Sequence, residues 1–323
     1  MTEKILVTGA AGFIGSHLCE RLVGDGAAVV GLDNFDPFYD RSIKEANVAA
    51  LRQAANFTLV EGDIRQEADV ERALTDAGNG PGPVTMVVHL AARAGVRPSI
   101  ADPLGYGDVN IRGTQVLLEA ARRQQIKHFV FASSSSVYGN NKKVPFAETD
   151  NVDYPISPYA ATKKAGELLC HTYSHLYDMD VNCLRFFTVY GPRQRPDLAI
   201  HKFARLMEAG EPIPVYGDGS MARDFTYIDD IIEGVLGAMR QWRGYAIYNL
   251  GESQPWRLDA LIEQLEQTLG KQALIDRKAV PPGDVVQTFA DIERARQVLG
   301  YAPKTPLPQG LAVFVKWLRE QGC

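Results

Sequence analysis

A glycine-rich turn near the N-terminus constrains the fold of this chain more than any other feature. Residues 8–15 read Thr-Gly-Ala-Ala-Gly-Phe-Ile-Gly; they follow an apolar run at 5–7 and lead into a helical pattern. Glycines at a strand-to-helix turn let the backbone come close to a pyrophosphate, which the free N–H groups and the positive dipole end of the helix hold. The alternative is a tight turn without a ligand. The residues predicted to bind a dinucleotide here are Gly9, Gly12, Phe13, Ile14 and Gly15.

The first 185 residues alternate short apolar runs with longer helical patterns. This alternation is typical of βαβ units, whose parallel strands are buried on both faces. We therefore expect an α/β fold, with a Rossmann-type doubly wound parallel sheet in residues 1–185 and a return to it near residues 225–250. Residues 186–323 contain more isolated helices and are predicted to form mainly a smaller α/β substrate lobe. The predicted strands are 5–7, 28–32, 57–60, 86–90, 128–132 and 181–185.

The composition argues against several classes of function. Lys and Arg total 34 against 39 Asp and Glu, so the net charge of -5 provides no field that would attract nucleic acid or an anionic membrane. No stretch approaches the roughly 18 consecutive apolar residues of a membrane span. The four cysteines share no metal-ligand spacing, and the N-terminus lacks a signal-peptide pattern. We expect a cytoplasmic protein with no metal, no nucleic-acid partner and no membrane partner.

Asp33 stands at the end of the second predicted strand. A carboxylate there can accept hydrogen bonds from both hydroxyls of an adenosine ribose and would repel the 2′-phosphate of NADP. This position favours NAD as the cofactor, and Asn34 is included in the same predicted site. The alternative for Asp33 is a helix cap or a turn residue.

Tyr159 and Lys163 are spaced i and i+4 in a helical pattern, which places both on one helix face. A free phenol has a pKa of about 10 and is a poor base near neutrality unless positive charge stabilises the phenolate. Lys163 can supply that charge, although the same spacing also occurs in ordinary solvated helices. Residues 133–136, four serines after the fifth predicted strand, can bring a hydroxyl beside the phenol.

The glycine turn, Asp33, the serine run, the Tyr-x-x-x-Lys spacing and the segment 185–192 occur together in the order typical of extended short-chain dehydrogenases/reductases. The chain resembles that family over nearly its whole length. The resemblance implies that Tyr159 is the acid/base, that Lys163 holds the nicotinamide ribose and lowers the phenol pKa, and that Ser134 binds the reacting sugar hydroxyl. Asn110, whose alternative is a helix cap, matches a family position near the cofactor. The other implied cofactor-lining residues are Asp63, Ile64, Leu90, Ala91 and Ala92.

The same family includes 4-epimerases, 4,6-dehydratases, decarboxylases and reductases, so the fold leaves the reaction open. Dehydratases of the family carry an Asp-Glu pair just before Val-Tyr-Gly, and the decarboxylases acting on UDP-glucuronic acid carry a glutamate there; this chain has Ser135 and Ser136. Epimerisation needs no additional acid, because C4 is oxidised to a transient 4-keto sugar and then reduced on its other face. We expect an NAD-dependent nucleotide-sugar 4-epimerase.

The substrate prediction depends on Thr188, since UDP-galactose epimerases and the decarboxylases generally have Asn there. Thr188 followed by residues 193–199 is similar to the UDP-glucuronate 4-epimerases, which interconvert UDP-glucuronic acid and UDP-galacturonic acid. Hydroxyls of Ser135, Ser136 and Thr188 would meet the substrate carboxylate. Arg195 would bind the carboxylate or the diphosphate; its alternative is a surface guanidinium. The resemblance adds Val215, Tyr216, Arg223 and Asp284 to the predicted UDP-sugar site.

Two other functions stay open from the sequence. UDP-glucose/UDP-galactose 4-epimerase uses the same reaction on a neutral sugar, and residues 280–284 read Val-Pro-Pro-Gly-Asp where many such epimerases have Arg-Arg-Pro-Gly-Asp. A non-catalytic NAD-binding sensor is an alternative of a different class; the retained Tyr159 and Lys163 argue against it. The resemblance also implies a homodimer formed by the helices after Asn110 and Tyr159.

Overall fold

The computed structural model describes residues 3–75, 82–280, 285 and 287–322. The chain divides into two compact units. The first comprises the described residues of Met1–Gly139, Asn151–Arg185 and Val235–Tyr248. The second comprises those of Asn140–Asp150, Phe186–Gly234 and Asn249–Cys323.

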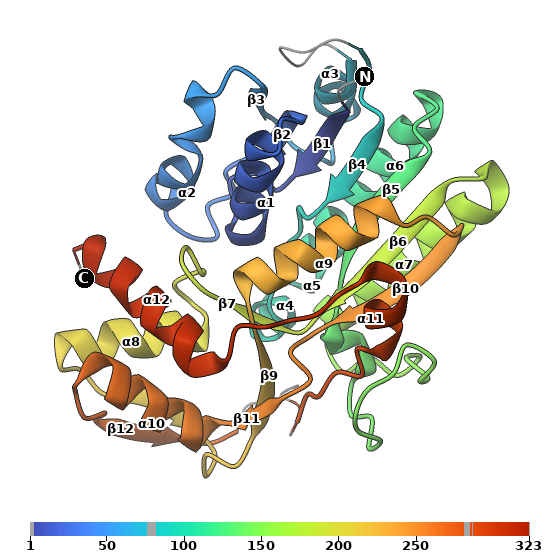
Figure 1. Ribbon diagram of the computed structural model, residues 1–323. Helices are drawn as coiled ribbons and strands as arrows, with labels where there is room; N and C mark the ends of the chain where they lie inside the picture. Colours follow the sequence, from blue (N-terminus) through green and yellow to red (C-terminus); the bar gives the residue numbers. More distant parts are fainter. Residues whose placement is uncertain (1–2, 76–81, 281–284, 286, 323) are drawn as a thin grey trace. The chain divides into compact units, whose positions relative to one another are not determined.

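A seven-stranded sheet forms the centre of the first unit (Figure 1). Its strand order is β10-β6-β5-β4-β1-β2-β3, and the neighbours from β3 through β2, β1 and β4 to β5 pair in parallel. From β1 the chain adds β2 and β3 on one side of the sheet and then β4 and β5 on the other side, so the strand order switches between β1 and β4. Doubly wound sheets bind their ligands at such a switch point. The predicted Rossmann-type fold is confirmed. The strands are β1 (Lys4–Thr8), β2 (Ala28–Asp33), β3 (Phe57–Glu61), β4 (Met86–His89), β5 (His128–Ser134), β6 (Asp180–Phe186) and β10 (Tyr245–Leu250).

Helices cover both faces of this sheet because the strands are apolar on both sides. On one face α6 (Gly113–Arg123) packs between α3 (Glu67–Thr75) and α7 (Pro158–Tyr177). On the other face lie α1 (Phe13–Gly24) and the C-terminal half of α9 (Ile228–Arg240), as Figure 1 shows. The remaining helices of the unit are α2 (Arg41–Val48), α4 (Val96–Ala101) and α5 (Pro103–Gly107).

Among its described residues, the second unit contains two small sheets and four further helices. One sheet has the order β11-β9-β7, and β12 pairs in parallel with β8 in the other. Helix α10 packs against α8 and α12. The elements are β7 (Thr188–Tyr190), α8 (Ala199–Ala209), β8 (Ile213–Tyr216), β9 (Ala222–Tyr227), β11 (Pro255–Arg257), α10 (Leu258–Leu269), β12 (Ile275–Lys278), α11 (Glu293–Leu299) and α12 (Leu307–Glu320).

Residues 140–150 cluster with the second unit, although they precede most of it in the chain. The backbone of Phe146 explains this position: its N–H donates to the carbonyl of Phe289 at 2.7 Å, and its carbonyl accepts from Asp291 N at 2.9 Å and from Asn249 Nδ2 at 2.8 Å. Residues 140–150 fall within the predicted first domain, 1–185, but the residues that bind Phe146 lie far along the chain, and no local sequence pattern marks this contact.

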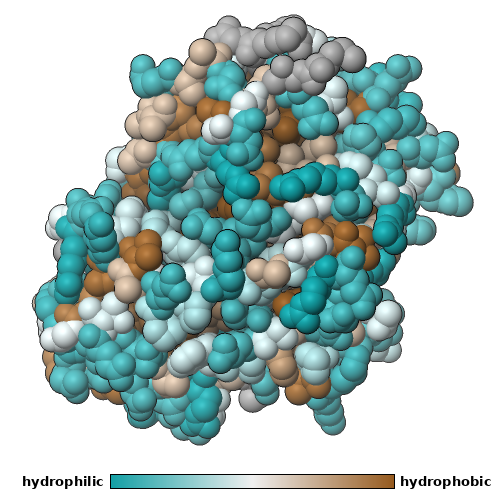
Figure 2. Space-filling model, viewed as in Figure 1, coloured by the Kyte–Doolittle hydropathy of each residue, from teal (hydrophilic) through white to brown (hydrophobic). Residues whose placement is uncertain are grey.

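The visible face in Figure 2 is mostly hydrophilic, with separate hydrophobic patches. The long apolar runs of the sequence are instead the sheet strands, in which β1, β2 and β4 are buried throughout. None of the helices in the described part of the chain combines the length and apolar character needed to cross a lipid bilayer.

Candidate active site

The glycine turn connects β1 to α1 and requires its glycines for space. Gly9 has φ +73°, and a Cβ there would lie 2.9 Å from the backbone nitrogen of Ala91. A Cβ on Gly12 would lie 3.1 Å from the Gly9 carbonyl oxygen. Gly12 caps α1 without a side-chain hydrogen bond, and the predicted residues Phe13, Ile14 and Gly15 form the first helical turn. The turn thus presents the N-terminus of α1 as a cradle for an anionic group.

Asp33 ends β2 directly beside this turn. Its Oδ2 accepts a hydrogen bond from Ala11 N at 3.0 Å, and its Oδ1 accepts one from Phe35 N at 2.8 Å. Burial raises the pKa of Asp33, while these two N–H groups and the charge of Lys44 act in the opposite direction. Each carboxylate oxygen keeps a lone pair that can accept from a ribose hydroxyl.

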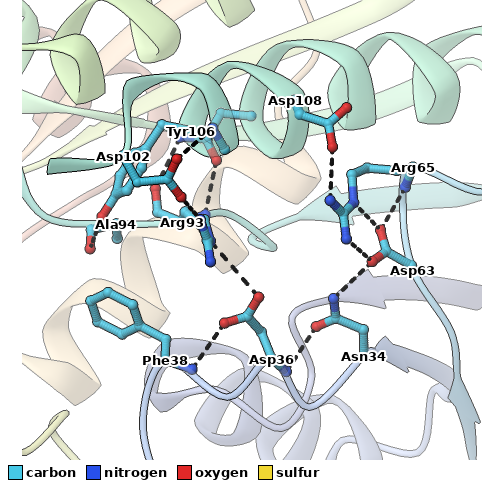
Figure 3. A network of polar contacts seen from close by, with 12 residues as sticks. Asn34, Asp36, Phe38, Asp63, Arg65, Arg93, Ala94, Asp102, Tyr106 and Asp108 are labelled. Atoms are coloured by element: carbon cyan, nitrogen blue, oxygen red, sulfur yellow. Dashed lines mark hydrogen bonds and ion pairs between the residues drawn. The ribbon is translucent and has the colours of Figure 1, made fainter. Parts of the chain in front are cut away.

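Asn34 and Asp63 are joined across the ends of β2 and β3. Asn34 Nδ2 donates to Asp63 Oδ2 at 2.9 Å, and the guanidinium of Arg65 binds both oxygens of the same carboxylate at 3.0 and 2.7 Å. Burial alone would raise the pKa of Asp63, but the hydrogen bonds from Arg65 and Asn34 outweigh it and lower the pKa to about 2. Arg65 also binds Asp108 at 2.7 Å, so the charges form one connected group (Figure 3). The predicted residue Ile64 is buried beside them.

Asn110 connects the segment after β4 to the catalytic helix candidate, α7. Its Oδ1 accepts from Arg93 N at 2.8 Å, and its Nδ2 donates to Arg93 O at 2.9 Å and to Thr162 Oγ1 at 3.0 Å. Figure 3 shows the Arg93 side chain extending between Asp102 and Asp36. Through these hydrogen bonds Asn110 bridges the segment after β4 and α7. It lies in a π-helical turn, Asp108–Arg112, rather than at a helix cap. The predicted residues Leu90, Ala91 and Ala92 are half-buried in the same segment.

Tyr159 and Lys163 lie one turn apart on α7, which begins at Pro158 with Ser157 as its N-cap. Tyr159 is half-buried, and its ring packs edge-on against Tyr106 with centroids 6.3 Å apart. Lys163 is only 4% exposed, and its Nζ donates to Ala132 O, at the end of β5, at 2.7 Å. Burial lowers the pKa of Lys163 to about 8. One ammonium hydrogen fixes the side chain to the sheet, and two remain for other partners.

The serine run forms the end of β5 and the tight turn that follows it. Ser134, buried, ends β5, and Ser135 and Ser136, both half-buried, begin the 3₁₀ turn Ser135–Tyr138. Ser134 Oγ accepts from Ser136 N at 3.1 Å and donates to Ser136 Oγ at 3.2 Å. Helix α7 packs against both β5 and this turn, so the first unit brings the serines to the helix that carries Tyr159.

His89 is a site-supporting residue that the sequence analysis missed. Its ring nitrogens contact Thr8 Oγ1 at 2.8 Å and Thr114 Oγ1 at 3.0 Å. Thr8 accepts from Ala91 N at 3.2 Å, and Thr114 donates to Asn110 O at 2.6 Å. With the proton on Nε2, every donor in this chain has an acceptor. Burial, with the charge of Lys163, lowers the pKa of His89 to about 3. The sequence feature that could have indicated this residue is an imidazole within the otherwise apolar strand β4.

Apart from the three serines, the predicted substrate residues that the structure describes belong to the second unit. Thr188 starts β7 and pairs with Phe225 of β9. Arg223, two residues earlier in β9, pairs with Trp256 of β11. Val215 and Tyr216 lie at the end of β8, Val215 buried and Tyr216 half-buried. Arg195 makes two hydrogen bonds to Asp197, at 3.0 and 2.8 Å, within its own loop. Asp284 lies outside the described residues.

Comparison with known proteins decides the family. A sequence model of the NAD dependent epimerase/dehydratase family matches residues 5–251, which is most of the chain. The chain belongs to this family. The family resemblance predicted from the motifs is thereby confirmed.

Individual relatives within the epimerase/dehydratase family match over nearly full length. A UDP-glucuronate 4-epimerase of Thermodesulfobacterium geofontis is 42% identical over 98% of this chain and 96% of its own length. The crystal structure of UDP-glucuronic acid 4-epimerase from Bacillus cereus, in complex with UDP-glucuronic acid and NAD, is 38% identical, with a TM-score of 0.91 and coverage of 98% and 99%. A UDP-glucose 4-epimerase of Thermotoga maritima, with UDP-glucose, is 32% identical, with a TM-score of 0.90 and coverage of 99% and 100%.

The residues of the first unit fit the family's cofactor. A Cβ at Gly9 or Gly15 would collide with neighbouring backbone and distort the turn at the N-terminus of α1, and Asp33 offers carboxylate oxygens at the adjoining strand end. Those residues would hold the pyrophosphate and the adenosine ribose of NAD.

Proposed function

We propose that this chain catalyses the NAD-dependent 4-epimerisation of UDP-glucuronic acid to UDP-galacturonic acid. The observation that carries the proposal is the pairing of Tyr159 and Lys163 on α7 with a turn that has serines at 135 and 136. This arrangement offers one acid/base and no second acid for an elimination. It supports oxidation and reduction at one carbon of the sugar.

Tyr159 is the proposed acid/base. Its phenolate takes the proton from the sugar O4, and the resulting phenol later returns it, with Ser134 orienting the same hydroxyl. The ammonium of Lys163, held at Ala132 O, stabilises the phenolate by its charge and holds the nicotinamide ribose. NAD, when bound, supplies reversible hydride acceptance at C4. The 4-keto sugar rotates in the site and is then reduced on its other face, so the configuration at C4 changes.

The choice of a uronic acid as substrate rests on Thr188 and on the relatives. Hydroxyls of Ser135, Ser136 and Thr188 suit a carboxylate that is bound by hydrogen bonds, and Arg195 adds a guanidinium that Asp197 now occupies in part. The two UDP-glucuronate 4-epimerases above are 42% and 38% identical to this chain, against 32% for the UDP-glucose enzyme. Val215, Tyr216, Arg223 and Asp284 complete the proposed UDP site.

Apolar side chains exposed on α7, the helix of Tyr159, and on α5, which precedes Asn110 rather than following it, support a homodimer. Leu104 on α5 is 86% exposed and Leu168 on α7 is 57% exposed, and these two helices pack together. A second copy that covers them would bury this area. Leu168→Glu is expected to yield monomers in analytical ultracentrifugation, whereas Leu274→Glu, at an exposed site of the second unit, is expected to leave dimers. We also propose a cytoplasmic location, which the free thiols of Cys19, Cys170 and Cys183 support.

NMR of purified protein incubated with UDP-glucuronic acid or UDP-glucose tests the function. The expected result is a new galacturonate anomeric signal and much slower change of UDP-glucose. Faster turnover of UDP-glucose would overturn the substrate assignment. Absence of turnover of either sugar, with NAD bound, would favour the non-catalytic sensor.

A further inference from the structure

A buried ion pair lies directly behind the serine turn. Arg185, at the end of β6, donates from Nε to Glu167 Oε1 at 2.8 Å and from Nη2 to Glu167 Oε2 at 2.9 Å. Arg185 is 1% exposed and Glu167 is fully buried. Removing two charges from water is costly, and a buried pair of this kind is a poor source of net stability compared with apolar residues of similar size. The pair therefore calls for a role other than stability.

Both members of the pair hold the serine turn, one from each side. Ser133 Oγ, just before Ser134, donates to Glu167 Oε1 at 2.7 Å. Arg185 Nη1 donates to the hydroxyl of Tyr138, the last residue of the turn, at 3.0 Å, and the guanidinium stacks 4.8 Å from the centroid of the same ring. The residues on either side of the segment 134–137 are thus fixed to one rigid charged group.

Glu167 also relates the turn to the catalytic helix. It lies four residues beyond Lys163 and eight beyond Tyr159, so the three side chains follow one stripe of α7. Tyr245 of β10 donates to the Glu167 backbone carbonyl at 3.1 Å, which ties this position of the helix to a further strand. A single element thereby bears the acid/base and the carboxylate that anchors the serine turn.

We propose that Glu167 and Arg185 are positioning residues that set the Ser134 hydroxyl relative to Tyr159. The inference rests on the proposed function in one respect, the assignment of Ser134 to the sugar hydroxyl. Neither Glu167 nor Arg185 touches substrate in this role; each acts through Ser133 or Tyr138.

The test leaves the pair intact and removes the hydroxyls bound to it, since variants of Glu167 or Arg185 would disrupt the buried ion pair itself and destabilise the fold. Ser133→Ala and Tyr138→Phe each delete one hydrogen bond to a charged group. Tyr173→Phe is the matched control, because Tyr173 lies on the same helix and its hydroxyl donates to another carboxylate, Glu119, at 3.2 Å. All variants are made in the full-length protein with NAD bound.

The first readout is amide hydrogen exchange, which requires no substrate. Ser136 N is held by Ser134 Oγ and Gly139 N by Ser136 O at 3.1 Å. We expect these two amides to exchange at least about tenfold faster in Ser133→Ala and Tyr138→Phe, the factor that one lost hydrogen bond typically gives. Tyr173→Phe should leave them unchanged. Unchanged exchange in both test variants would overturn the proposal whatever sugar the protein uses.

The second readout is turnover, measured on whichever UDP-sugar the wild-type protein epimerises. Each test variant should lower kcat roughly tenfold with little change in KM, since positioning acts on the transition state. In a Ser134→Ala background the same substitutions should have almost no further effect, because Ser134 transmits their influence. Equal losses with and without Ser134 would overturn the positioning role, whereas a substrate other than UDP-glucuronate would overturn only the proposed function.

Discussion

The carbonyl oxygen of Gly9 lies 2.0 Å from the point that a Cβ atom would occupy at Gly15. The first turn of α1 therefore approaches the end of β1 more closely than any side chain permits. This contact holds the N-terminus of α1 against the glycine turn, where the N–H groups of the helix face the proposed pyrophosphate position. It gives the third glycine of the motif a steric explanation.

Gly15→Ala is expected to displace this backbone, lowering the free energy of unfolding by about 1–3 kcal/mol, a typical cost of overpacking. Bound NAD should be lost, which absorbance of nucleotide released from denatured protein will measure. Gly24→Ala, at the other end of the same helix, is the control: a Cβ there meets no atom within 4 Å. It should raise stability by about 0.5–1 kcal/mol and retain NAD. Full NAD content in Gly15→Ala would contradict the steric argument.

Tyr159→Phe should remove nearly all turnover, roughly 100-fold to 10,000-fold, because a general acid/base contributes about this much. NAD binding should persist, since the ring and its contact with Tyr106 are retained. Tyr177→Phe makes the same change at the exposed end of α7 and should leave turnover unchanged. Initial rates and released nucleotide are the measurements. Near-normal turnover in Tyr159→Phe would refute the assigned role.

Asp33→Asn should weaken NAD binding about tenfold or more, because hydrogen bonds to a charged acceptor are among the stronger ones. NADP binding should improve relative to NAD, since the carboxylate no longer repels a 2′-phosphate. Calorimetric titration with both dinucleotides measures the ratio. Asp25→Asn, which alters an exposed carboxylate paired with Arg21 on the same unit, should not move it. An unchanged NAD/NADP ratio in Asp33→Asn would remove Asp33 from the ribose site.

His89 predicts an acid-sensitive contribution to stability. Its pKa is about 3 in the folded protein and about 6.5 when unfolded. Between these values the unfolded chain binds the additional proton, so stability falls as pH drops below 6.5, by about 1.4 kcal/mol per pH unit. Above pH 6.5 the residue is neutral in both states and contributes no such dependence.

Urea unfolding of wild type and His89→Gln at pH 7, 6 and 5 tests this expectation. The variant should be less stable at pH 7 because it breaks the Thr8 and Thr114 contacts. Its deficit should shrink by roughly 2 kcal/mol at pH 5, since the glutamine has no proton to bind. His175→Gln, at an exposed position of α7, should follow wild type. Parallel stability curves for wild type and His89→Gln would show that His89 is not held neutral.

Local patterns in the sequence were sufficient to predict six strands of the large sheet, the glycine turn and the helix that carries the Tyr-x-x-x-Lys spacing. Each depends on residues close in the chain: an apolar run for a buried strand, glycines at a turn, or an i, i+4 spacing on a helix. The six strands predicted from such runs correspond to β1 through β6. The family follows from the order of these features along the chain, and the roles of individual residues stay predictions.

Only the tertiary structure decided which side chains support that site. Thr8 meets His89 across 81 residues, Asn110 meets Thr162 across 52, and the ion pair behind the serine turn joins Glu167 and Arg185 from a helix and a strand. These pairings follow from how the elements pack, and no local periodicity encodes them. The sequence by itself thus determined the fold class and the family, because both depend on short-range patterns and their order along the chain. The surrounding hydrogen bonds required the folded chain, because a buried donor or acceptor is matched by whatever lies beside it in space.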